Sequence, residues 1–514
     1  MILHMKRYKL KSVLAVASVA SLLVGGQACT DLDAEVFDRA EASKFPANEE
    51  ELLSTVGSTY GQLRGFLDPV LVLNEATTDE LVVPTRGPDW YDNGSWQQMA
   101  RHEWSPVSPG QINGSWEWAY RVIAGANINL AALEASELQV EGKEAIIAEL
   151  RMLRAFAYFW LMDMFGNVPI ITEDSPAGNP PQNTRQEIYD FVEAEITGAL
   201  PDLKDEAGVV AYSRFTKGAA NAMLAKLYLN AEVYTGTPQW QKALDAANAV
   251  ISAEAGYSLN PEYLENFAVN NGSNTDTYEE NIFAIPYDKV LAGGMNMHMR
   301  TLHYAQGAAY GLSSNPWNGF ATRAEFYNTY SDDDKRKAMW LEGPQLNAAG
   351  EVITFVDAVD GELKDLVFTP EINSLEKAFG NEGVRNVKYE VQRNNTRNDQ
   401  DNDLAVLRYA DVLLMKAEAL LHLGQTAEAL DLVNEVRARA GVDPLTTLTS
   451  DILLEERGRE LAWEGWRRND LIRFGKYISG TWQFKNVSEP YRDLYPIPSQ
   501  QISNNPNLKQ NPGY

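Results

Sequence analysis

The sequence contains one cysteine and only five histidines among its 514 residues. A single thiol cannot close a disulfide within the chain, and it cannot supply the thiolates of a structural zinc or iron–sulfur site. Basic residues are also scarce, because 44 Lys and Arg oppose 71 Asp and Glu and leave a net charge of −27. A surface of this sign repels phosphate backbones, so we expect no nucleic-acid partner.

After residue 29 the sequence has no apolar run long enough to span a bilayer. Before it, a basic stretch at residues 6–11 precedes an apolar stretch at 13–24 and small residues that end at Cys29. This order is typical of a secretory signal. The position of the lone cysteine predicts a bacterial lipoprotein, with a signal peptide at residues 1–28 and a membrane anchor of acyl chains on Cys29. The alternative is a chance cysteine at an ordinary cleavage site.

With 45% apolar residues, the chain can bury a large core. Apolar residues recur with helical periodicity through the first half. The clearest segment, 143–165, is apolar on nearly all sides and is followed by Gly166, so we expect a buried helix that ends there. The helices predicted in the first half lie at residues 49–64, 116–133, 143–165, 184–200, 215–234 and 240–251.

The pattern changes at residues 257–403, where helical periodicity weakens and Gly, Asn, Asp and aromatic residues dominate. We predict a loop-rich insertion here, with short strands or buried turns at 282–285 and 366–368. The insertion separates an N-terminal helical part, residues 29–256, from a C-terminal helical part, residues 404–514. Long aromatic loops on a helical frame are a common way to build a binding site.

Helical stripes return in the C-terminal part at 410–420 and 429–440, and Gly424 separates them. Two helices across such a short turn form an αα-hairpin, and small alanines let hairpins stack closely, as in tetratricopeptide repeats. Two further helices are predicted within 451–479, and the proline-containing tail from Tyr495 is predicted to be extended. The fold class is therefore predicted to be mainly α.

Several long motifs occur in an order that resembles the SusD/RagB family of nutrient-uptake outer-membrane lipoproteins from Bacteroidetes. The resemblance extends in patches from Cys29 to Tyr514. The motifs are RMLRAFAYFWL at 151–161, FGNVP at 165–169, RYADVLLMKAEA at 408–419, EERGRELAWEGWR at 455–467, YPIP at 495–498 and NPNLKQNPGY at 505–514.

The resemblance implies about four tetratricopeptide-like hairpins and an irregular insertion that forms the ligand face. It also implies a surface-exposed lipoprotein, anchored in the outer membrane, that lies over a TonB-dependent transporter of the SusC type. Such proteins capture oligosaccharides or polysaccharides, and sometimes peptides, and they are not enzymes.

Sugar sites combine aromatic rings, which pack on the apolar faces of the sugar, with side chains that hydrogen-bond hydroxyl groups. Residues 89–96 place three aromatics in a polar, Gly-containing stretch, which makes Trp90 and Trp96 candidate ligand residues. The alternative is that they pack locally against the helical frame. Asp79 precedes this stretch, and the resemblance places it on the ligand face, with an ordinary loop or helix-end carboxylate as the alternative.

A second group of candidates lies in the predicted insertion. Tyr310 and Trp317 belong to the Gly- and Ser-rich segment 304–319, in the region where the resemblance places the ligand site. Arg393, followed by two asparagines, is a planar hydrogen-bond donor of the kind that binds sugar hydroxyls. Ordinary surface ion pairing is its alternative role.

Three carboxylates, Asp399, Asp401 and Asp403, alternate like the first ligands of a calcium-binding EF-hand loop. Leu404 stands where that loop needs Gly, and Ala410 stands where it needs a bidentate Glu. A solvated loop is the preferred interpretation, with calcium as the alternative, and no other metal or cofactor is predicted.

We predict a glycan-binding lipoprotein that delivers oligosaccharide to its transporter. The alternatives are the same scaffold bound to peptide or glycopeptide, a lipid-anchored glycoside hydrolase, and a structural adaptor without a small ligand. A hydrolase would need two carboxylates at a set separation. The acid- and Arg-rich segment 455–467 is predicted to form structural ion pairs rather than a catalytic centre.

Overall fold

The computed structural model describes residues 48–514 except 137–138, 140 and 209–210. The predicted signal peptide and Cys29 lie outside the described residues. Within the part that is described, no helix combines the length and the apolar composition that crossing a membrane demands.

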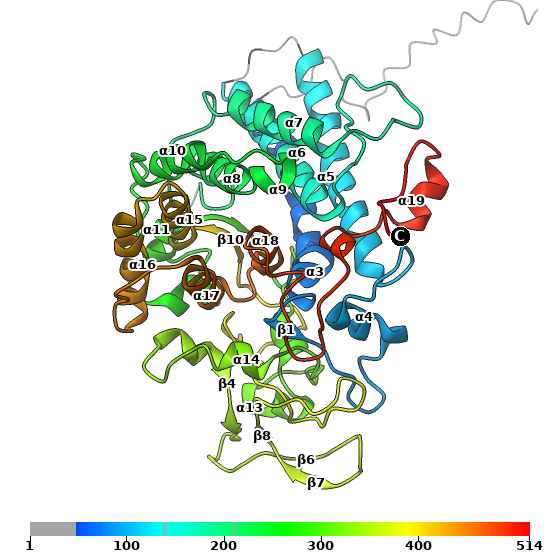
Figure 1. The fold of residues 1–514 in the computed structure, drawn as a ribbon, viewed down its shortest axis with the longest axis vertical. Helices are drawn as coiled ribbons and strands as arrows, with labels where there is room; N and C mark the ends of the chain where they lie inside the picture. The colour runs from blue at the N-terminus through cyan, green and yellow to red at the C-terminus, as the bar shows by residue number, and fades with distance from the viewer. Residues whose placement is uncertain (1–47, 137–138, 140, 209–210) are drawn as a thin grey trace, which may run out of the picture.

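Long helices pack in succession into an arch that runs from the top of the molecule down its left side in Figure 1. Each helix contacts the next, and α10 contacts α15 directly although the insertion separates them in sequence. The predicted mainly α fold of tetratricopeptide-like hairpins is confirmed. The arch consists of α2 (Glu49–Gln62), α5 (Gly110–Ala135), α6 (Lys143–Phe165), α7 (Arg185–Ala199), α8 (Lys217–Leu229), α10 (Trp240–Ile251), α15 (Tyr409–His422) and α16 (Thr426–Ala440).

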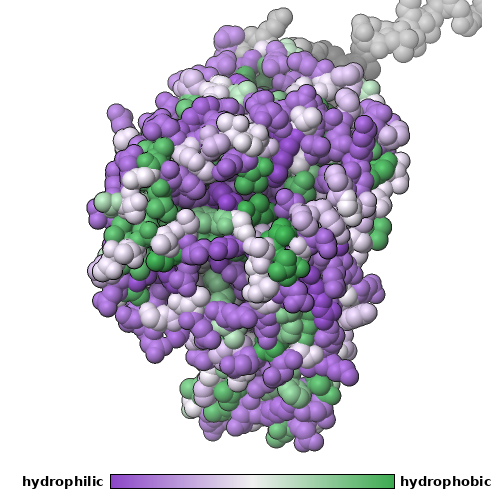
Figure 2. All heavy atoms as spheres, viewed as in Figure 1, coloured by the Kyte–Doolittle hydropathy of each residue, from purple (hydrophilic) through white to green (hydrophobic). Residues whose placement is uncertain are grey.

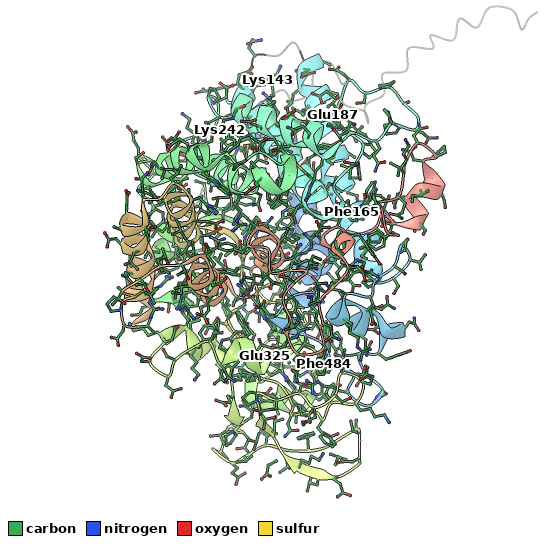
Figure 3. All side chains as sticks on the ribbon, in the orientation of Figure 1. Lys143, Phe165, Glu187, Lys242, Glu325 and Phe484 are labelled. Atoms are coloured by element: carbon green, nitrogen blue, oxygen red, sulfur yellow. The ribbon has the colours of Figure 1, made fainter. Side chains whose placement is uncertain are left out.

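Helix α6 is the central element of the core. It begins near the surface at Lys143 and ends in the interior at Phe165, as Figure 3 shows. Its last eighteen positions are nearly all buried, because apolar residues occur on every side of it. Gly166 follows with φ 71°, and a side chain there would press against Leu494. Glycine therefore ends the helix where no other residue fits.

The first helix does not end at residue 64 as predicted. The chain continues through the 3₁₀ turn η2 (Leu63–Phe66), the π turn η3 (Leu67–Leu71) and α3 (Val72–Ala76). Pro69 cannot donate the hydrogen bond that a regular α-helix needs, and the widened turn accommodates it. This irregular stretch brings residues before the candidate loops into the core.

An antiparallel strand pair, β2 (Asn281–Ile285) and β10 (Leu404–Arg408), joins the insertion to the strand that leads into α15. Both strands are fully buried, which confirms the predicted strand at 282–285. The register pairs Leu404 with Ile285 and Arg408 with Asn281, so a charged side chain enters the interior at the end of the sheet.

The rest of the insertion consists of short elements. Its strands form two-stranded antiparallel sheets: β4 (Trp340–Leu341) with β9 (Arg385–Asn386), β5 (Gly343–Pro344) with β8 (Val367–Phe368), and β6 (Thr354–Val356) with β7 (Leu363–Asp365). A further strand, β3 (Ala321–Thr322), pairs with β1 (Leu81–Val82) of the N-terminal part. Its short helices are η5 (Tyr263–Phe267), α11 (Thr275–Glu280), α12 (Met297–Thr301), η6 (Tyr304–Gln306), α13 (Gly307–Tyr310), α14 (Ala324–Tyr327) and η7 (Lys335–Met339).

The β6–β7 hairpin forms the lower tip of the molecule (Figure 1). It carries exposed apolar residues, including Val356 and Leu363. Val356 and Leu363 are register partners, so they form one small apolar pair. Figure 2 shows small green groups at this end of the molecule among hydrophilic residues. An apolar patch of this size is ordinary on a protein surface.

The C-terminal tail packs back onto the arch. The amide of Tyr495 donates to the Met164 carbonyl over 2.8 Å, and the Asn511 side chain donates to the Phe165 carbonyl over 2.9 Å. These bonds cover carbonyl groups that α6 leaves unsatisfied at its end. The prediction of an extended tail is partly wrong, because α19 (Ser499–Asn504) is a helical turn within it.

A buried network of ion pairs joins the insertion to α17 (Ser450–Leu461), and α17 pairs in turn with α18 (Arg467–Arg473). Its centre is Glu460, which accepts hydrogen bonds from Arg408, Arg439 and Arg336. All four side chains are almost completely buried. The prediction of structural ion pairs in segment 455–467 is confirmed.

Candidate functional site

Three loops from distant parts of the sequence meet within the insertion. The Trp90 ring nitrogen donates to the Trp317 carbonyl over 2.6 Å, and the Tyr304 hydroxyl donates to Asp89 over 2.7 Å. The main-chain amide after Arg393 donates to the Tyr310 carbonyl over 2.9 Å. We call the side chains that these loops bring together the loop site, which consists of Asp89, Trp90, Tyr304, Tyr310, Trp317 and Arg393.

The aromatic rings of the loop site are partly buried, whereas Asp89 and Arg393 are exposed. The Arg393 guanidinium lies 4.6 Å from the centre of the Tyr310 ring and donates to the Ala309 carbonyl over 3.1 Å. Attraction between the cation and the ring holds both groups in place. Among the predicted site residues, the structure therefore pairs Trp90 with the main chain of Trp317 and Tyr310 with Arg393.

The backbone of the loop site is strained at Trp90, which has φ 63°. Bulky residues rarely adopt this left-handed conformation, and it persists where the surroundings enforce it, often at functional sites. Gly319 makes room for the ring, because a side chain at 319 would collide with Trp90. Eight non-glycine residues of the described chain have positive φ, and five of them lie in or beside these loops: Trp90, Asp92, Asn93, Asn318 and Asn394.

Trp96 packs locally, which is the alternative to a ligand role. Trp96 belongs to the short helix α4 (Ser95–Arg101), which turns it inward, and it is only 5% exposed. Its ring nitrogen donates to Asp92 over 2.6 Å, and its ring packs edge-on against Trp90 and Phe320. Trp96 supports Trp90 from behind and presents no face to a ligand.

Sequence reasoning did not select four residues of this region, one of which is Asp89 of the loop site. Tyr91 is 59% exposed, and Tyr304 contacts Asp89, although both were visible as aromatics in the two predicted loops. Arg300 had no sequence signal. Its guanidinium lies 6.0 Å from the Trp317 ring and 5.4 Å from the Phe320 ring.

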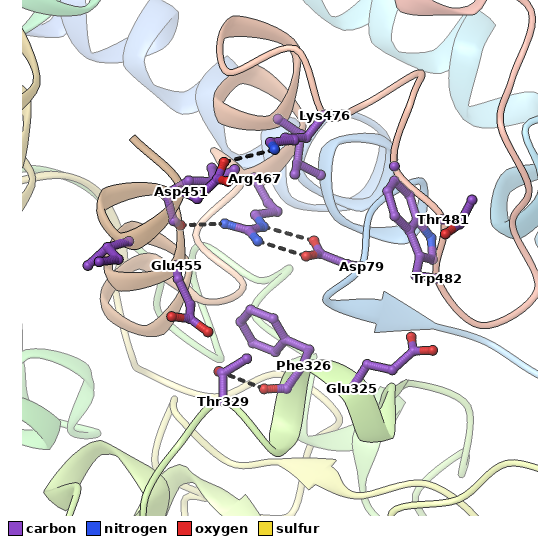
Figure 4. A pocket seen from close by; sticks show the side chains of 14 residues that line it. Asp79, Glu325, Phe326, Thr329, Asp451, Glu455, Arg467, Lys476, Thr481 and Trp482 are labelled. Carbon is purple, nitrogen blue, oxygen red and sulfur yellow. Dashed lines mark hydrogen bonds and ion pairs between the residues drawn. The ribbon is translucent and has the colours of Figure 1, made fainter. Parts of the chain in front are cut away.

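Asp79 lies apart from the loop site, in a cavity of about 550 Å³. Figure 4 shows its carboxylate facing Arg467, with two hydrogen bonds of 2.7 and 2.8 Å. Burial alone would raise the pKa of Asp79, but the Arg467 guanidinium outweighs it and lowers that pKa. Asp79 is thus already paired, and its role in ligand binding stays a prediction.

The other charged groups of this cavity also have partners within the protein. Asp451 forms an ion pair with Lys476 over 2.8 Å, as Figure 4 shows. Glu325, which Figure 4 also labels, accepts a hydrogen bond from the main-chain amide of Gln483 over 2.9 Å. Paired groups have fewer free bonds to offer a ligand. We therefore assign the cavity walls to the frame rather than to the ligand site.

Behind Asp79, two fully buried carboxyl groups, Glu75 and Glu80, interact with each other. Burial raises the pKa of both groups, that of Glu80 to about 7, and the nearby Arg467 counteracts this only in part. Glu75 also accepts a hydrogen bond from the main-chain amide of Gly465 over 2.6 Å, and Glu80 accepts one from the main-chain amide of Trp463 over 3.1 Å. The pair therefore retains a proton near neutral pH.

This pair predicts a pH dependence of stability. Between its usual 4.5 and about 7, the folded Glu80 keeps a proton that the unfolded chain has released, so the free energy of unfolding falls as pH rises. Glutamine at position 80 cannot ionise. We therefore expect the free energy of unfolding of Glu80→Gln to fall by at least about 1 kcal/mol less than that of the wild type between pH 5 and pH 8. Urea unfolding at pH 5 and pH 8 measures the difference. The exposed Glu428→Gln on α16 should leave it unchanged, and an unaltered slope in Glu80→Gln would refute the prediction.

The three alternating carboxylates do not converge. Lys289 pairs with Asp401 over 2.5 Å, and Asp403 accepts the Tyr287 amide over 2.8 Å. Asp399 lies beside Gly293. Among residues that the structure describes, no group of three or more acidic, histidine or cysteine side chains could hold a metal ion.

Two family models match the chain. Residues 50–229 match a model described as "Starch-binding associating with outer membrane", and residues 230–514 match the model of the SusD family. The chain belongs to the SusD family. Among curated SusD relatives, the "Starch-binding protein SusD" of Bacteroides thetaiotaomicron is 28% identical over 88% of this chain and 86% of its own length. "SusD-like protein P2" of Formosa agariphila is 27% identical over 99% of this chain and 100% of its own length.

Solved structures of SusD-like proteins share the fold. A "Laminarin binding SusD-like protein" superposes with a TM-score of 0.73 and 25% identity, over 91% of this chain and 100% of that one. "Surface glycan-binding protein A from Bacteroides thetaiotaomicron in complex with laminarihexaose" gives 0.72 and 22%, over 90% and 99%. At 22% identity, the likeness to this second structure supports only a shared fold.

Proposed function

We propose that this protein binds oligosaccharides at the loop site and does not cleave them. The observation that carries this proposal is the set of partly exposed rings in two of the three loops, with Trp90 held in a strained conformation against the main chain of Trp317. Membership of the SusD family and the starch- and laminarin-binding names of its relatives support the choice of ligand.

The chemistry of the loop site suits a glycan. Ring faces such as that of Trp317 pack on the apolar faces of sugar rings. Asp89 already accepts from the Tyr304 hydroxyl and Arg393 already donates to the Ala309 carbonyl, but the second carboxylate oxygen and the other guanidinium nitrogens are left for sugar hydroxyl groups. A protein that captures and then releases its ligand needs only modest affinity. We expect dissociation constants between about 1 μM and 1 mM, which correspond to roughly −8 to −4 kcal/mol.

The carboxyl groups with raised pKa values are buried, and this position argues against cleavage of a bound glycan by them. A hydrolase needs one carboxylic acid with a raised pKa that can reach the substrate. Glu75, Glu80 and Asp403 have raised pKa values, yet all three side chains are buried. They therefore cannot protonate a leaving group in the loop site.

Calorimetry tests the proposal against its main alternative. We expect heat of binding from at least one member of a panel of neutral glucan oligosaccharides, including laminarihexaose and maltohexaose, and none from a panel of peptides of similar length. Product analysis after prolonged incubation should show no shortening of the bound glycan. Binding of peptides alone, or shortening of the glycan, would overturn the proposal.

The proposal includes anchoring through Cys29 at the outer membrane and delivery to a SusC-like transporter. The support is the signal-like sequence before Cys29 and the match of residues 50–229 to the family model described as "Starch-binding associating with outer membrane". We expect membrane-extracted protein to begin with an acylated Cys29 in mass spectrometry and to co-purify with a transporter. An unmodified chain in the soluble fraction would contradict this anchoring.

A further inference from the structure

A second cavity, of about 520 Å³, lies beside the loop site. Segments far apart in the sequence form its walls: the irregular turns after α2, the start of α5, and the segment that leads into α12. Three arginines project from these elements, namely Arg64, Arg121 and Arg300. We call this cavity the arginine pocket, and its positive groups stand out in a chain with a net charge of −27.

Small residues keep the arginine pocket open. A side chain added at Gly110 would meet no atom within 4 Å, so this part of the wall faces free space. Gly110 also begins α5, a helix of 26 residues, whose first amides point out of the helix end. The positive end of that helix adds to the field of the arginines.

Two carboxylates line the same walls, and each has a partner. Asp68 accepts a hydrogen bond from Arg300 over 2.8 Å, and Glu117 accepts one from the Asn113 side chain over 2.8 Å. By contrast, the exposed Arg121 guanidinium has no hydrogen bond or ion pair with any described residue. Arg64 uses only its Nε, which donates to the Pro286 carbonyl. The guanidinium of Arg121 and the outer nitrogens of Arg64 thus remain available as donors.

Arg300 connects the arginine pocket with the loop site. It lines the pocket, and its guanidinium also lies against the Trp317 and Phe320 rings. Its Nε donates to Asn296 over 2.8 Å, which holds the side chain in this position. A glycan that stacks on Trp317 therefore lies beside Arg300, whose charge is shared with Asp68, and Arg64 and Arg121 line the same cavity beyond it.

We infer that the arginine pocket binds an anionic substituent, a carboxylate or a sulfate ester, on a sugar held by the loop site. Guanidinium groups bind such oxygens with two parallel, charge-assisted hydrogen bonds. The inference rests on the proposed function and narrows its substrate class to acidic glycans. Neutral glycans would use the loop site alone.

The first test is calorimetry with matched pairs, each an acidic oligosaccharide and its neutral form. Tetragalacturonate is compared with its methyl ester, and a sulfated oligosaccharide with its desulfated form, which distinguishes the two anions. We expect an acidic member to bind at least about tenfold more tightly than its neutral partner. Equal affinity within both pairs would overturn the inference.

Variants locate the effect. Arg121→Ala should weaken binding of the acidic member about tenfold and leave the neutral member unchanged, while Arg121→Lys should lose less. Lys204→Ala removes the same charge from an exposed position outside the pocket and should change neither. Equal loss for both members in Arg121→Ala would contradict the assignment of this pocket.

A third measurement separates this inference from the proposed function. Glucuronate and sodium sulfate, titrated at constant ionic strength, should shift amide resonances around Gly110 in the wild type and in Trp317→Ala, but not in Arg121→Ala. Such shifts without oligosaccharide binding would reject the proposed function and retain the pocket. Oligosaccharide binding without these shifts would retain the proposed function and reject the assignment of an anion site to the arginine pocket.

Discussion

Trp317→Ala is expected to weaken binding of the best glycan about 30-fold and to leave the fold intact. Loss of one stacked indole removes about 2 kcal/mol of apolar and ring contact with the sugar. Trp90 bonds to the main-chain oxygen of residue 317, which alanine retains, so the neighbouring ring should stay in place. Calorimetry gives the affinity, and circular dichroism checks the fold.

Trp240→Ala is the matched control for this change. Trp240 is also partly buried, but it lies at the start of α10 and stacks on His422 at 3.9 Å, away from the loop site. It should bind glycan as the wild type does. If Trp317→Ala retained wild-type affinity, or Trp240→Ala lost as much, the ring of Trp317 would not belong to the ligand site.

Glu460→Ala is expected to lower the free energy of unfolding by about 3–5 kcal/mol. The change leaves Arg336, Arg408 and Arg439 buried without their shared carboxylate. The arginines keep Asp334, Glu456, Glu280 and Glu464 as partners, but the network loses one negative charge, and the excess positive charge that stays in the interior is not hydrated. Urea unfolding at pH 7 measures the loss.

The same helix supplies the control variant. Glu455 is 52% exposed on α17, and its pair with Arg459 spans 3.4 Å, so Glu455→Ala should lower the free energy of unfolding by less than about 1 kcal/mol. Equal unfolding midpoints for Glu460→Ala and Glu455→Ala would show that the network adds little to stability.

Acid should destabilise the wild type in the same way as Glu460→Ala does. The arginines hold the pKa of Glu460 at about 2 although burial opposes them. The stability that Glu460 contributes is therefore present above its usual pKa of 4.5 and is lost as the pH falls towards 2.

Local pattern was sufficient for the long helices. Segments 143–165 and 240–251 are helical over the predicted residues, because periodic apolar faces and a following Gly166 act within a few residues of each other. Prediction failed at residues 63–76, where a π turn at Pro69 depends on burial in the core, and at the tail, where α19 packs onto the arch.

The candidate site shows the same division. Aromatic residues in polar, glycine-containing stretches indicated Trp90, Tyr310 and Trp317, but they could not show that these stretches meet. Trp96 has the same local signal as Trp90, and only a short helix turns it inward. Asp79 is paired with Arg467, which lies 388 residues further along the chain.

The order of residues alone therefore established a helical protein of negative charge, with a lipoprotein-like start and aromatic loops in an insertion. Which rings meet, which carboxylates are neutralised and where the arginines gather depended on the folded chain. Periodicity and helix caps are short-range properties, whereas exposure and charge pairing depend on contacts between segments hundreds of residues apart.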